Sequence, residues 1–317
     1  MKVLVTELMW EDGIEELKQT GHTVDYDMEL CRKRDDLLKL APKYDALIVR
    51  NETRVDPELL DVAKNVKVIG RLGVGLDNID LEATKARNIP VIAAKHANAT
   101  SVVEYVMAAM LDAYRPLADA DADVRLGNWD RKFFTGYELN QKTLGLVGLG
   151  EIAHRVARRA SAFGIRVIGY DPFVTSYDHV LAETGVYPVT TLDELFPESD
   201  FISVHVPLTK ATKHMINKES FSRMKSHAYV INTARGGIVH ELDLVEAVQS
   251  EKIAGAYLDV LENEPVQQGS PLLQVESIRL SPHIAGLTDE SQSRTAMLIA
   301  REVTKVLNGG ESLCAVL

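Results

Sequence analysis

Strand-length apolar runs alternate with helical patterns along almost the whole chain, and this alternation limits the fold more than any other feature. Parallel strands joined by helices are buried on both faces, so they appear as short, continuous apolar runs. In the first third we expect strands at Lys2–Thr6, Ala46–Val49 and Val66–Ile69, and helices at Ile14–Thr20 and Pro57–Lys64. The pattern predicts an α/β chain built on parallel sheets.

The alternation stops near Ala97 and starts again at Thr143, which predicts two structural units. A long helical stretch, Thr100–Arg115, and a polar segment, Asp119–Lys132, lie between these points. Within the long stretch, Ser101 and Glu104 have the spacing of a capping box. The strands expected in the second unit are Thr143–Val147, Arg166–Tyr170, Phe201–Val204, Tyr229–Asn232, Gly255–Asp259 and Ile278–Leu280.

The last helical stretch, Asp289–Leu307, ends at Asn308-Gly309-Gly310, a typical helix stop. The second series of strands is complete in itself, whereas the first is expected to recruit this terminal helix. We therefore expect two Rossmann-like, doubly wound parallel-sheet domains with a cleft between them. Residues 1–97 and 289–317 would form one discontinuous domain, and residues 98–288 the other.

Charge and residue usage exclude several classes of protein. A formal net charge of −11 argues against a general nucleic-acid surface, which needs clustered Lys and Arg. The only cysteines, Cys31 and Cys314, cannot form a disulfide scaffold and favour a reducing cytoplasm. No signal peptide or membrane-spanning run is expected. His205, His214 and His283 lack metal-ligand spacing with cysteine or carboxylate, so no metal site is expected.

A glycine-rich turn at Gly148–Ala153 follows an apolar strand and precedes a helical pattern, which is the context of a dinucleotide-binding turn. Asp171 ends the next strand, 171 − 148 = 23 residues after the first glycine. A carboxylate there can accept hydrogen bonds from a ribose diol, and no adjacent Arg would bind a 2′-phosphate, so NAD is favoured over NADP. The alternatives are a turn without ligand and a simple strand-end turn before Pro172.

Three segments near the end of the chain bring arginine, glutamate and histidine: Thr233–Gly236, Glu262–Pro265 and Ser281–Gly286. These residue types can bind a carboxylate, orient an imidazole and move a proton. Alone, each of the three is more often an ordinary surface or loop residue. Following a dinucleotide-binding turn, they indicate hydride transfer on a 2-hydroxy or 2-oxo acid.

With these residues in place, the chain resembles the NAD-dependent D-2-hydroxyacid dehydrogenases, most closely the phosphoglycerate dehydrogenase branch, over nearly its whole length. The resemblance implies reversible reduction of a 2-oxo acid to a D-2-hydroxy acid, with residues 98–288 binding NAD and the discontinuous domain binding the substrate. The matching segments are Val49–Thr53, Arg71–Asn78, Asn98–Glu104, Glu138–Ala153, Asn232–Gly236, Leu258–Val260, Glu262–Pro265 and Pro282–Gly286.

The resemblance also implies roles for single residues. Arg235 would bind the substrate carboxylate, His283 would be the acid in reduction and the base in oxidation, and Glu264 would orient the imidazole and stabilise its charged form. The residues expected at the cofactor are Gly148, Gly150, Glu151, Ile152, Asp171, Pro207, Thr212, Thr233, Ala234, Arg235, Asp259, His283 and Gly286. Those expected at the substrate are Arg50, Asn51, Val74, Gly75 and Arg235.

Two departures from the family pattern concern the substrate. Asn51 stands where the family commonly has Ser, and Lys95-His96 stands where many members have Pro-Gly. Together with Arg50 and Arg71, these cations could form a pocket for a second anionic group, or they could be solvated loop charges. The candidate pairs are 3-phosphohydroxypyruvate with 3-phosphoglycerate, 3-sulfopyruvate with sulfolactate, and the smaller acids hydroxypyruvate and glyoxylate.

Assembly and a rival function complete the expectations. The apolar residues of Thr100–Arg115 exceed one core face, and the family uses this region for dimers, so a homodimer is expected. With its end at Leu317, the chain is expected to be a short form without a regulatory domain. The rival from another class is an NAD-sensing binding protein, because C-terminal-binding-protein corepressors resemble this chain and keep the same three residues.

Overall fold

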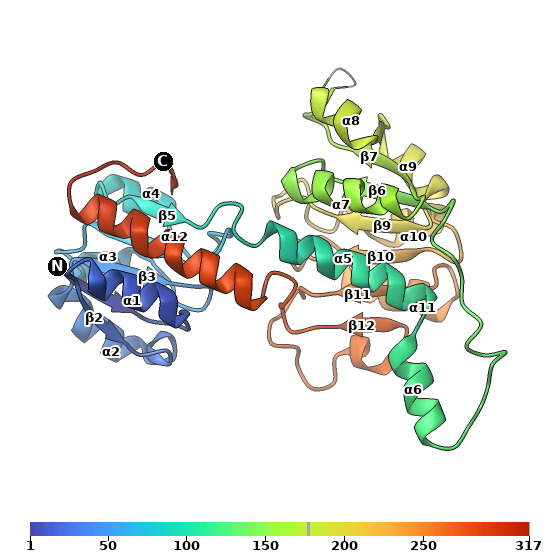
Figure 1. The fold of residues 1–317 in the computed structure, drawn as a ribbon, viewed down its shortest axis with the longest axis horizontal. Coiled ribbons are helices and arrows are strands. Elements are labelled where there is room, and N and C mark those ends of the chain that lie inside the picture. Colours follow the sequence, from blue (N-terminus) through green and yellow to red (C-terminus); the bar gives the residue numbers. More distant parts are fainter. Residues whose placement is uncertain (176–177, 317) are drawn as a thin grey trace. The chain divides into compact units, whose positions relative to one another are not determined.

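The computed structural model describes residues 1–175 and 178–316, which divide into two compact units (Figure 1). Unit 1 contains Met1–Asn98 and the chain from Leu287 onward, and unit 2 contains Ala99–Gly286. Each unit has a sheet of mainly parallel strands with helices on both faces. This is the predicted α/β class. Among the described residues, no helix combines the length and apolar character needed to cross a bilayer.

The sheet of unit 1 has the order β13-β5-β4-β3-β1-β2, and only the pairing of β13 with β5 is antiparallel. Its strands are β1 (Lys2–Val5), β2 (Thr23–Tyr26), β3 (Ala46–Val49), β4 (Val68–Arg71), β5 (Val91–Ala93) and β13 (Ala315–Val316). β4 begins two residues later than predicted, because Val66 donates its N–H to the carbonyl of Ala63 in a turn. Three strands of this sheet were not predicted. The side chains of β2 are largely exposed at the sheet edge, and β5 and β13 have only three and two residues.

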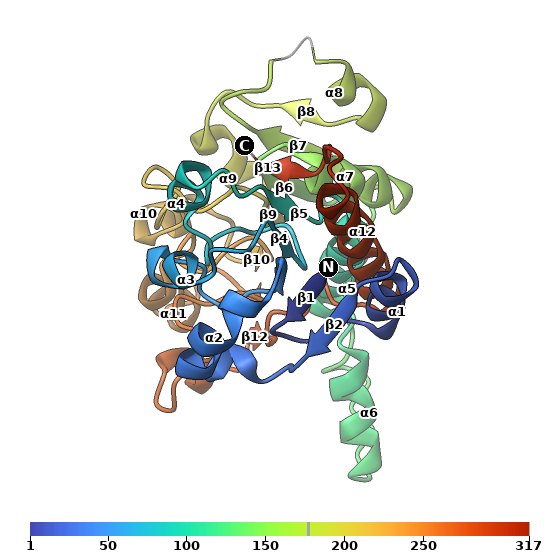
Figure 2. The ribbon, with the colours of Figure 1, turned by 90° about the vertical axis from the view of Figure 1, so that its left-hand side faces the viewer.

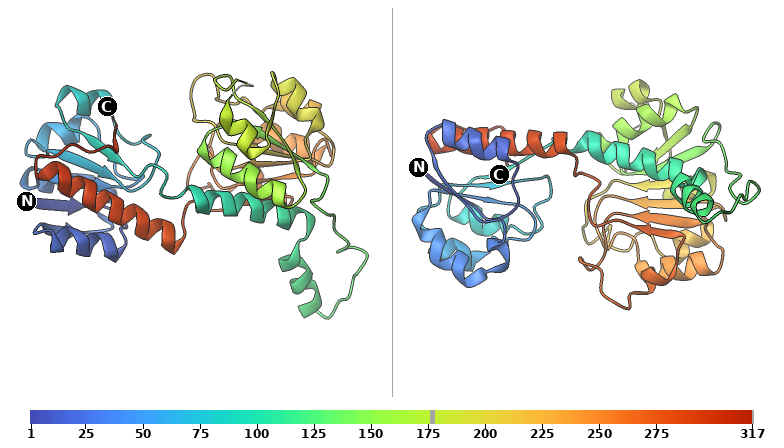
Figure 3. Two further views of the ribbon diagram at one scale, coloured as in Figure 1. Left: turned by 45° about the horizontal axis from the view of Figure 1, so that its top comes forward. Right: turned by 60° about the horizontal axis from the view of Figure 1, so that its bottom comes forward.

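Helices cover both faces of this sheet. They are α1 (Glu11–Gln19), α2 (Arg34–Leu40), α3 (Pro57–Val62), α4 (Leu81–Ala86) and α12 (Asp289–Leu307), with short 3₁₀ turns η1 (Leu30–Arg32) and η2 (Ala41–Lys43). The helices α1 and α12 lie side by side on one face (Figures 2 and 3). Successive strand residues point to opposite faces, so Val3 and Val5 pack with α1 and α12, whereas Leu4 packs with α2, α3 and α4.

The sheet of unit 2 is parallel throughout, with the order β12-β11-β10-β9-β6-β7-β8. Its strands are β6 (Thr143–Val147), β7 (Arg166–Tyr170), β8 (Tyr187–Pro188), β9 (Phe201–Val204), β10 (Tyr229–Asn232), β11 (Gly255–Leu258) and β12 (Ile278–Leu280). Strand order reverses at β6, which pairs with β7 on one side and with β9 on the other. In such sheets, ligands bind beyond the carboxyl ends of the strands at this switch point.

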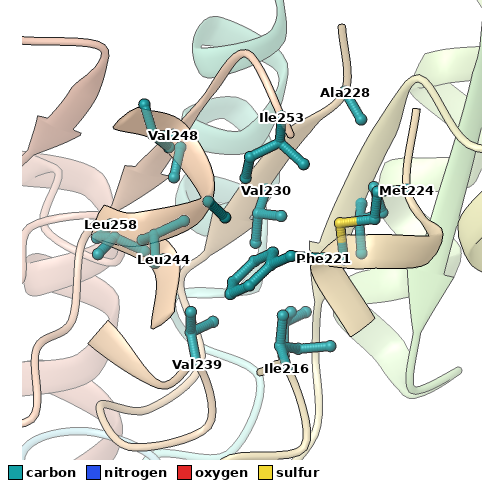
Figure 4. Close-up of a cluster of buried hydrophobic side chains, with 14 of the residues drawn as sticks. Ile216, Phe221, Met224, Ala228, Val230, Val239, Leu244, Val248, Ile253 and Leu258 are labelled. Atoms are coloured by element: carbon teal, nitrogen blue, oxygen red, sulfur yellow. The ribbon is translucent and has the colours of Figure 1, made fainter. Parts of the chain in front are cut away.

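Two layers of helices enclose the sheet of unit 2. Its helices are α5 (Ala99–Tyr114), α6 (Leu117–Arg125), α7 (Glu151–Ala162), α8 (His179–Thr184), α9 (Leu192–Glu198), α10 (Lys218–Arg223) and α11 (Glu241–Gln249), with a 3₁₀ turn η3 (Pro271–Gln274). The helices α5 and α7 pack on one face, and α9, α10 and α11 pack on the other. Figure 4 shows Phe221 of α10 among Ile216, Val230 and Val239, in the hydrophobic core between the sheet and the helices α9, α10 and α11.

Two expectations for this region need correction. The helix α5 begins at Ala99, so Ser101 lies inside it and does not cap it; a capping box occurs at α12, where Thr288 and Ser291 exchange hydrogen bonds. Most of α6 falls within the predicted polar segment, and this helix buries none of its residues. The apolar residues Val103, Val106, Ala109 and Met110 of α5 belong to the core of unit 2, and the homodimer expected through this helix stays a prediction.

Candidate active site

The turn between β6 and α7 contains two glycines, and glycine suits each position for a different physical reason. Gly148 has φ +92°, and a Cβ there would lie 2.7 Å from the carbonyl oxygen of His205, so only glycine fits. A Cβ at Gly150 would meet nothing within 4 Å. Internal packing therefore does not require the second glycine, which leaves open space beside the N-terminal end of α7. A pyrophosphate fits this arrangement.

The predicted ribose contact, Asp171, is held in place by its own chain. Its Oδ2 accepts the N–H of Leu149 and its Oδ1 accepts the N–H of Phe173, each at 2.9 Å. A carboxylate oxygen can accept two hydrogen bonds, so both oxygens keep capacity for a diol. Glu151 and Ile152 begin α7, where Glu151 forms an ion pair with Arg155.

The loops after β9 and β10 hold the next predicted cofactor residues. Thr212 donates its hydroxyl to the carbonyl oxygen of Pro207 at 2.6 Å, and Ala234 donates its N–H to Oδ1 of Asn232 at 3.0 Å. The hydroxyl oxygen of Thr233 is buried and has no hydrogen-bond partner among the described residues. A buried polar atom without a partner is uncommon in a native structure, and a bound ligand would supply the missing partner.

Arg235 is fixed through its main chain. Its carbonyl oxygen accepts Nδ2 of Asn232 at 2.9 Å, and its guanidinium donates to the carbonyl oxygen of Ala234 at 2.6 Å. The next residue, Gly236, lies so close to the following loop that a Cβ would be 1.8 Å from the carbonyl oxygen of Leu261. The loop carrying Arg235 therefore lies against the loop carrying Glu264.

Glu264 and His283 form the central pair of the candidate site. Nδ1 of His283 lies 2.8 Å from Oε2 of Glu264, and Oε1 accepts the N–H of Leu261 at 3.0 Å. Burial alone would raise the pKa of Glu264. Hydrogen bonds with His283 and Leu261 and the positive charge of Arg235 outweigh burial and lower that pKa below its ordinary value. An ionised carboxylate thus holds one imidazole nitrogen, which leaves Nε2 as the nitrogen available for proton transfer.

Asp259 holds the loop that carries the histidine. This residue is 1% exposed, and its carboxylate accepts the Ser281 hydroxyl at 2.6 Å and the N–H groups of Ile284 and Ala285 at 2.7 and 2.8 Å. His283 has a left-handed φ of +56°, which strains the loop, and these hydrogen bonds offset that strain. Asp259 was expected at the nicotinamide; its visible contacts are to this loop, which ends unit 2 at Gly286.

Several residues around the site were missed by sequence reasoning. The hydroxyl of Tyr105 on α5 lies 2.6 Å from the Ser281 hydroxyl and extends the Asp259 network. No local signal marks Tyr105, which sits in an apolar helical pattern, whereas Asn232 was visible as a polar residue ending an apolar strand. His205 follows β9, 2.9 Å from the Ser203 hydroxyl, and burial lowers its pKa to about 4.

Four of the five predicted substrate residues belong to unit 1, at the carboxyl ends of neighbouring strands, whereas the fifth, Arg235, belongs to unit 2. Arg50 and Asn51 follow β3, Val74 and Gly75 follow β4, and Val49 of β3 pairs with Arg71 of β4. Among the described residues, the N–H groups of Val74 and Gly75 donate to no acceptor, as a carboxylate-binding turn requires. Lys95 and His96 are exposed beyond β5. The structure thus groups these residues within unit 1, and Arg235, Glu264 and His283 within unit 2.

One family model and several curated proteins match this chain. The model describes the D-isomer specific 2-hydroxyacid dehydrogenase, NAD binding domain, and matches residues 107–285. The D-3-phosphoglycerate dehydrogenase of Archaeoglobus fulgidus is 42% identical over 309 residues, which cover 98% of this chain and 58% of that enzyme. The chain therefore spans little more than half the length of that relative.

Two further relatives match over most of their own length. The hydroxypyruvate reductase of Thermotoga maritima is 42% identical over 279 residues, which cover 87% of this chain and 89% of that enzyme. The (S)-sulfolactate dehydrogenase of Chromohalobacter salexigens is 40% identical over 305 residues, which cover 96% of this chain and 98% of that enzyme. The names of the three relatives give two dehydrogenases and one reductase, each of a different acid.

Proposed function

The chain belongs to the D-isomer-specific 2-hydroxyacid dehydrogenase family, and on that premise we propose that it interconverts a 2-oxo acid and a D-2-hydroxy acid with NAD. The observation that carries the proposal is the pair of Glu264 and His283, with 2.8 Å between Oε2 and Nδ1. Such a pair can hold a protonated imidazole and present its other nitrogen to a reacting oxygen. In this proposal unit 2 binds NAD, and unit 1 supplies substrate contacts.

The residues of the site divide the reaction among them. Arg235 binds the substrate carboxylate, since a guanidinium can donate two parallel hydrogen bonds to it. In reduction, Nε2 of His283 donates a proton to the carbonyl oxygen, which becomes the hydroxyl; in oxidation the same nitrogen takes that proton back. Glu264 keeps the imidazole oriented and offsets its positive charge. The bound nicotinamide supplies the hydride in one direction and accepts it in the other.

We propose a dianionic acid as the preferred substrate, with 3-phosphohydroxypyruvate and 3-phosphoglycerate as the first pair to test. Four basic side chains lie at or just beyond the carboxyl ends of neighbouring strands of unit 1: Arg50 follows β3, Arg71 ends β4, and Lys95 and His96 follow β5. Clustered cations in a chain of net charge −11 create a local positive field that attracts a second anionic group. The phosphoglycerate and sulfolactate enzymes support this choice, whereas the hydroxypyruvate reductase favours the smaller acids.

The test is NADH oxidation with 3-phosphohydroxypyruvate, 3-sulfopyruvate, hydroxypyruvate and glyoxylate. His283→Asn should slow turnover about 10²–10⁴-fold and leave the dissociation constant of NADH nearly unchanged. His227→Asn is the matched control, because His227 also pairs with a carboxylate, Asp200, at 2.8 Å outside the site. Full activity of His283→Asn would remove this histidine from the mechanism. Binding of NADH without turnover of any acid would favour the NAD-sensing alternative.

We also propose a homodimer in a reducing cytoplasm. Exposed apolar side chains cluster on α6 and the segment after it, where Leu126, Trp129 and Phe133 are 80%, 76% and 76% exposed. Figure 1 shows α6 extending away from the sheet of unit 2. A second copy of the chain would cover this surface. Solution scattering should give a dimer mass at micromolar concentration, and a monomer mass would contradict the proposal.

A further inference from the structure

Glu7 lies two residues beyond β1, and a single loop uses both oxygens of its carboxylate. Glu7 is 3% exposed. Its Oε1 accepts the N–H groups of Arg50 and Thr53 at 2.7 and 2.9 Å. Its Oε2 accepts those of Asn51 and Glu52 at 3.1 and 2.9 Å. Four consecutive backbone donors therefore converge on one side chain from another strand.

A metal site is the obvious competing reading of this carboxylate. Oxygens of Glu7 and Glu52 and the sulfur of Cys31 lie within 4.8 Å of one another. Metal ligation needs a thiolate, yet burial and the two neighbouring carboxylates raise the pKa of Cys31 to about 11. The four N–H groups already occupy the carboxylate of Glu7. The geometry is that of an internal anion that serves its own chain.

The loop needs such an anion, because its backbone has no strand partner for these N–H groups. Buried N–H groups left without acceptors are costly, and a buried carboxylate is costly unless it is hydrogen-bonded. The arrangement satisfies both requirements at once. From the other side, Nδ2 of Asn78 donates to the carbonyl oxygens of Arg50 and Thr53 at 3.2 and 2.6 Å. The hydroxyls of Thr6 and Thr53 also meet at 2.8 Å.

We propose that Glu7 is a positioning residue for substrate binding, which fixes the backbone of residues 50–53 and so presents Arg50 and Asn51 to the acid. The inference rests on the proposed function, because Arg50 and Asn51 are proposed there as substrate contacts. Glu7 itself lies beneath the loop and does not bind the substrate. Its loss should therefore weaken binding of the acid without touching the proton-transfer residues or the NADH site of unit 2.

The test compares the full-length parent with Glu7→Gln. Glutamine keeps one accepting oxygen, while its NH₂ group would face two N–H donors and cannot bind them. We expect amide hydrogen exchange in residues 50–53 to be faster by tenfold or more. We expect KM for the preferred acid to rise on the order of tenfold, about 1.4 kcal/mol, with a much smaller change in kcat. The dissociation constant of NADH, from fluorescence titration, should stay unchanged.

Asp45→Asn is the matched control. Oδ2 of Asp45 also accepts a backbone N–H, that of Lys2, at 2.8 Å. Asp45 precedes β3 and Lys2 begins β1, so their hydrogen bond lies at the N-terminal ends of these strands. Glu7 and residues 50–53 lie beyond the C-terminal ends of the same strands. This control removes the same charge from unit 1, and it should leave exchange in residues 50–53 and KM unchanged.

The outcomes separate this inference from the proposed function. A folded Glu7→Gln variant with unchanged exchange in residues 50–53 would overturn the inference whatever the protein catalyses. Faster exchange with unchanged KM in an active enzyme would overturn the link to substrate. A parent that reduces no acid would refute the proposed function, while hydrogen exchange would still decide whether Glu7 fixes the loop. If Glu7→Gln does not fold, Glu7→Asp replaces it; its shorter side chain should give intermediate exchange, and exchange equal to the parent's would overturn the inference.

Discussion

Replacing each glycine of the phosphate turn by alanine should separate folding from cofactor binding. At Gly148, a methyl group would enter a left-handed conformation, which costs about 1–2 kcal/mol. It would also lie 2.7 and 2.8 Å from the His205 carbonyl oxygen and Val206 Cγ1. The backbone oxygen cannot rotate away, so overpacking adds about 1–3 kcal/mol. Gly148→Ala should therefore lower the free energy of unfolding by roughly 2–5 kcal/mol.

Gly150→Ala should behave in the opposite way. Its φ of −77° and ψ of −173° suit alanine, and a Cβ there meets nothing within 4 Å. Alanine is a poorer helix cap than glycine, but it restricts the unfolded chain, and these effects of about 0.5–1 kcal/mol oppose each other. Stability should therefore change by less than about 1 kcal/mol. NADH affinity should fall at least about tenfold, since the methyl group occupies the space where the backbone must approach the phosphates.

Urea unfolding followed by circular dichroism gives the stability of both variants, and fluorescence titration gives NADH affinity for those that remain folded. The argument depends on the contrast between neighbouring positions. If Gly150→Ala bound NADH as tightly as the parent, the open space at the start of α7 would not be the phosphate site. If Gly148→Ala were as stable as the parent, the backbone contact with His205 would not restrict this turn.

Three further predictions concern single side chains. Asp171→Ala should reduce the preference for NADH over NADPH in kcat/KM, because lost hydrogen bonds to a charged acceptor are worth roughly 1.5–3 kcal/mol; equal parent efficiency with both cofactors would contradict this role. Lys95→Ala, compared with Lys39→Ala on α2, should reduce the preference for 3-phosphohydroxypyruvate over glyoxylate, and an unchanged ratio would mark Lys95 as a surface charge. Burial alone would raise the pKa of Asp200, but hydrogen bonds from the N–H of Thr143 and from the side chains of His227 and Lys225 hold it below the ordinary 3.8. Asp200→Asn should therefore lower the free energy of unfolding by about 2 kcal/mol at pH values above 3.8, and this difference from the parent should disappear as the pH falls through the lowered pKa. A difference in urea unfolding that stays constant down to pH 2 would refute the stabilising role of the Asp200 charge.

The sequence predicted well those elements whose environment is uniform along the chain. Strands such as β6 and β9 are buried at every position and therefore read as continuous apolar runs. The edge strand β2 and the exposed helix α6 lack that signal, because few or none of their side chains reach the core. Burial was not sufficient in every case, because β5 lies inside its sheet and is buried at all positions, yet this three-residue strand was not predicted.

The candidate site was predicted unevenly for a related reason. Glu264 and His283 are 19 residues apart, and family resemblance suggested their pairing, which local spacing could not. Neither resemblance nor periodicity indicated Glu7, because its role depends on four N–H groups that are more than 40 residues away along the chain. Contacts of this kind become visible only when the strands are aligned in space.

The discontinuity of unit 1 has a consequence for synthesis on the ribosome. Ile299 and Val303 of α12 belong to the same core as Val3 and Val5, but 188 residues of unit 2, from Ala99 to Gly286, are translated in between. Translation at about 5–20 residues per second takes on the order of 10–40 s to synthesise unit 2. During that time the N-terminal sheet lacks the helix that covers one of its faces. Unit 2 can form its core during that interval. A released chain that ends at Gly286 should accordingly contain a protease-resistant unit 2 and a protease-sensitive N-terminal segment.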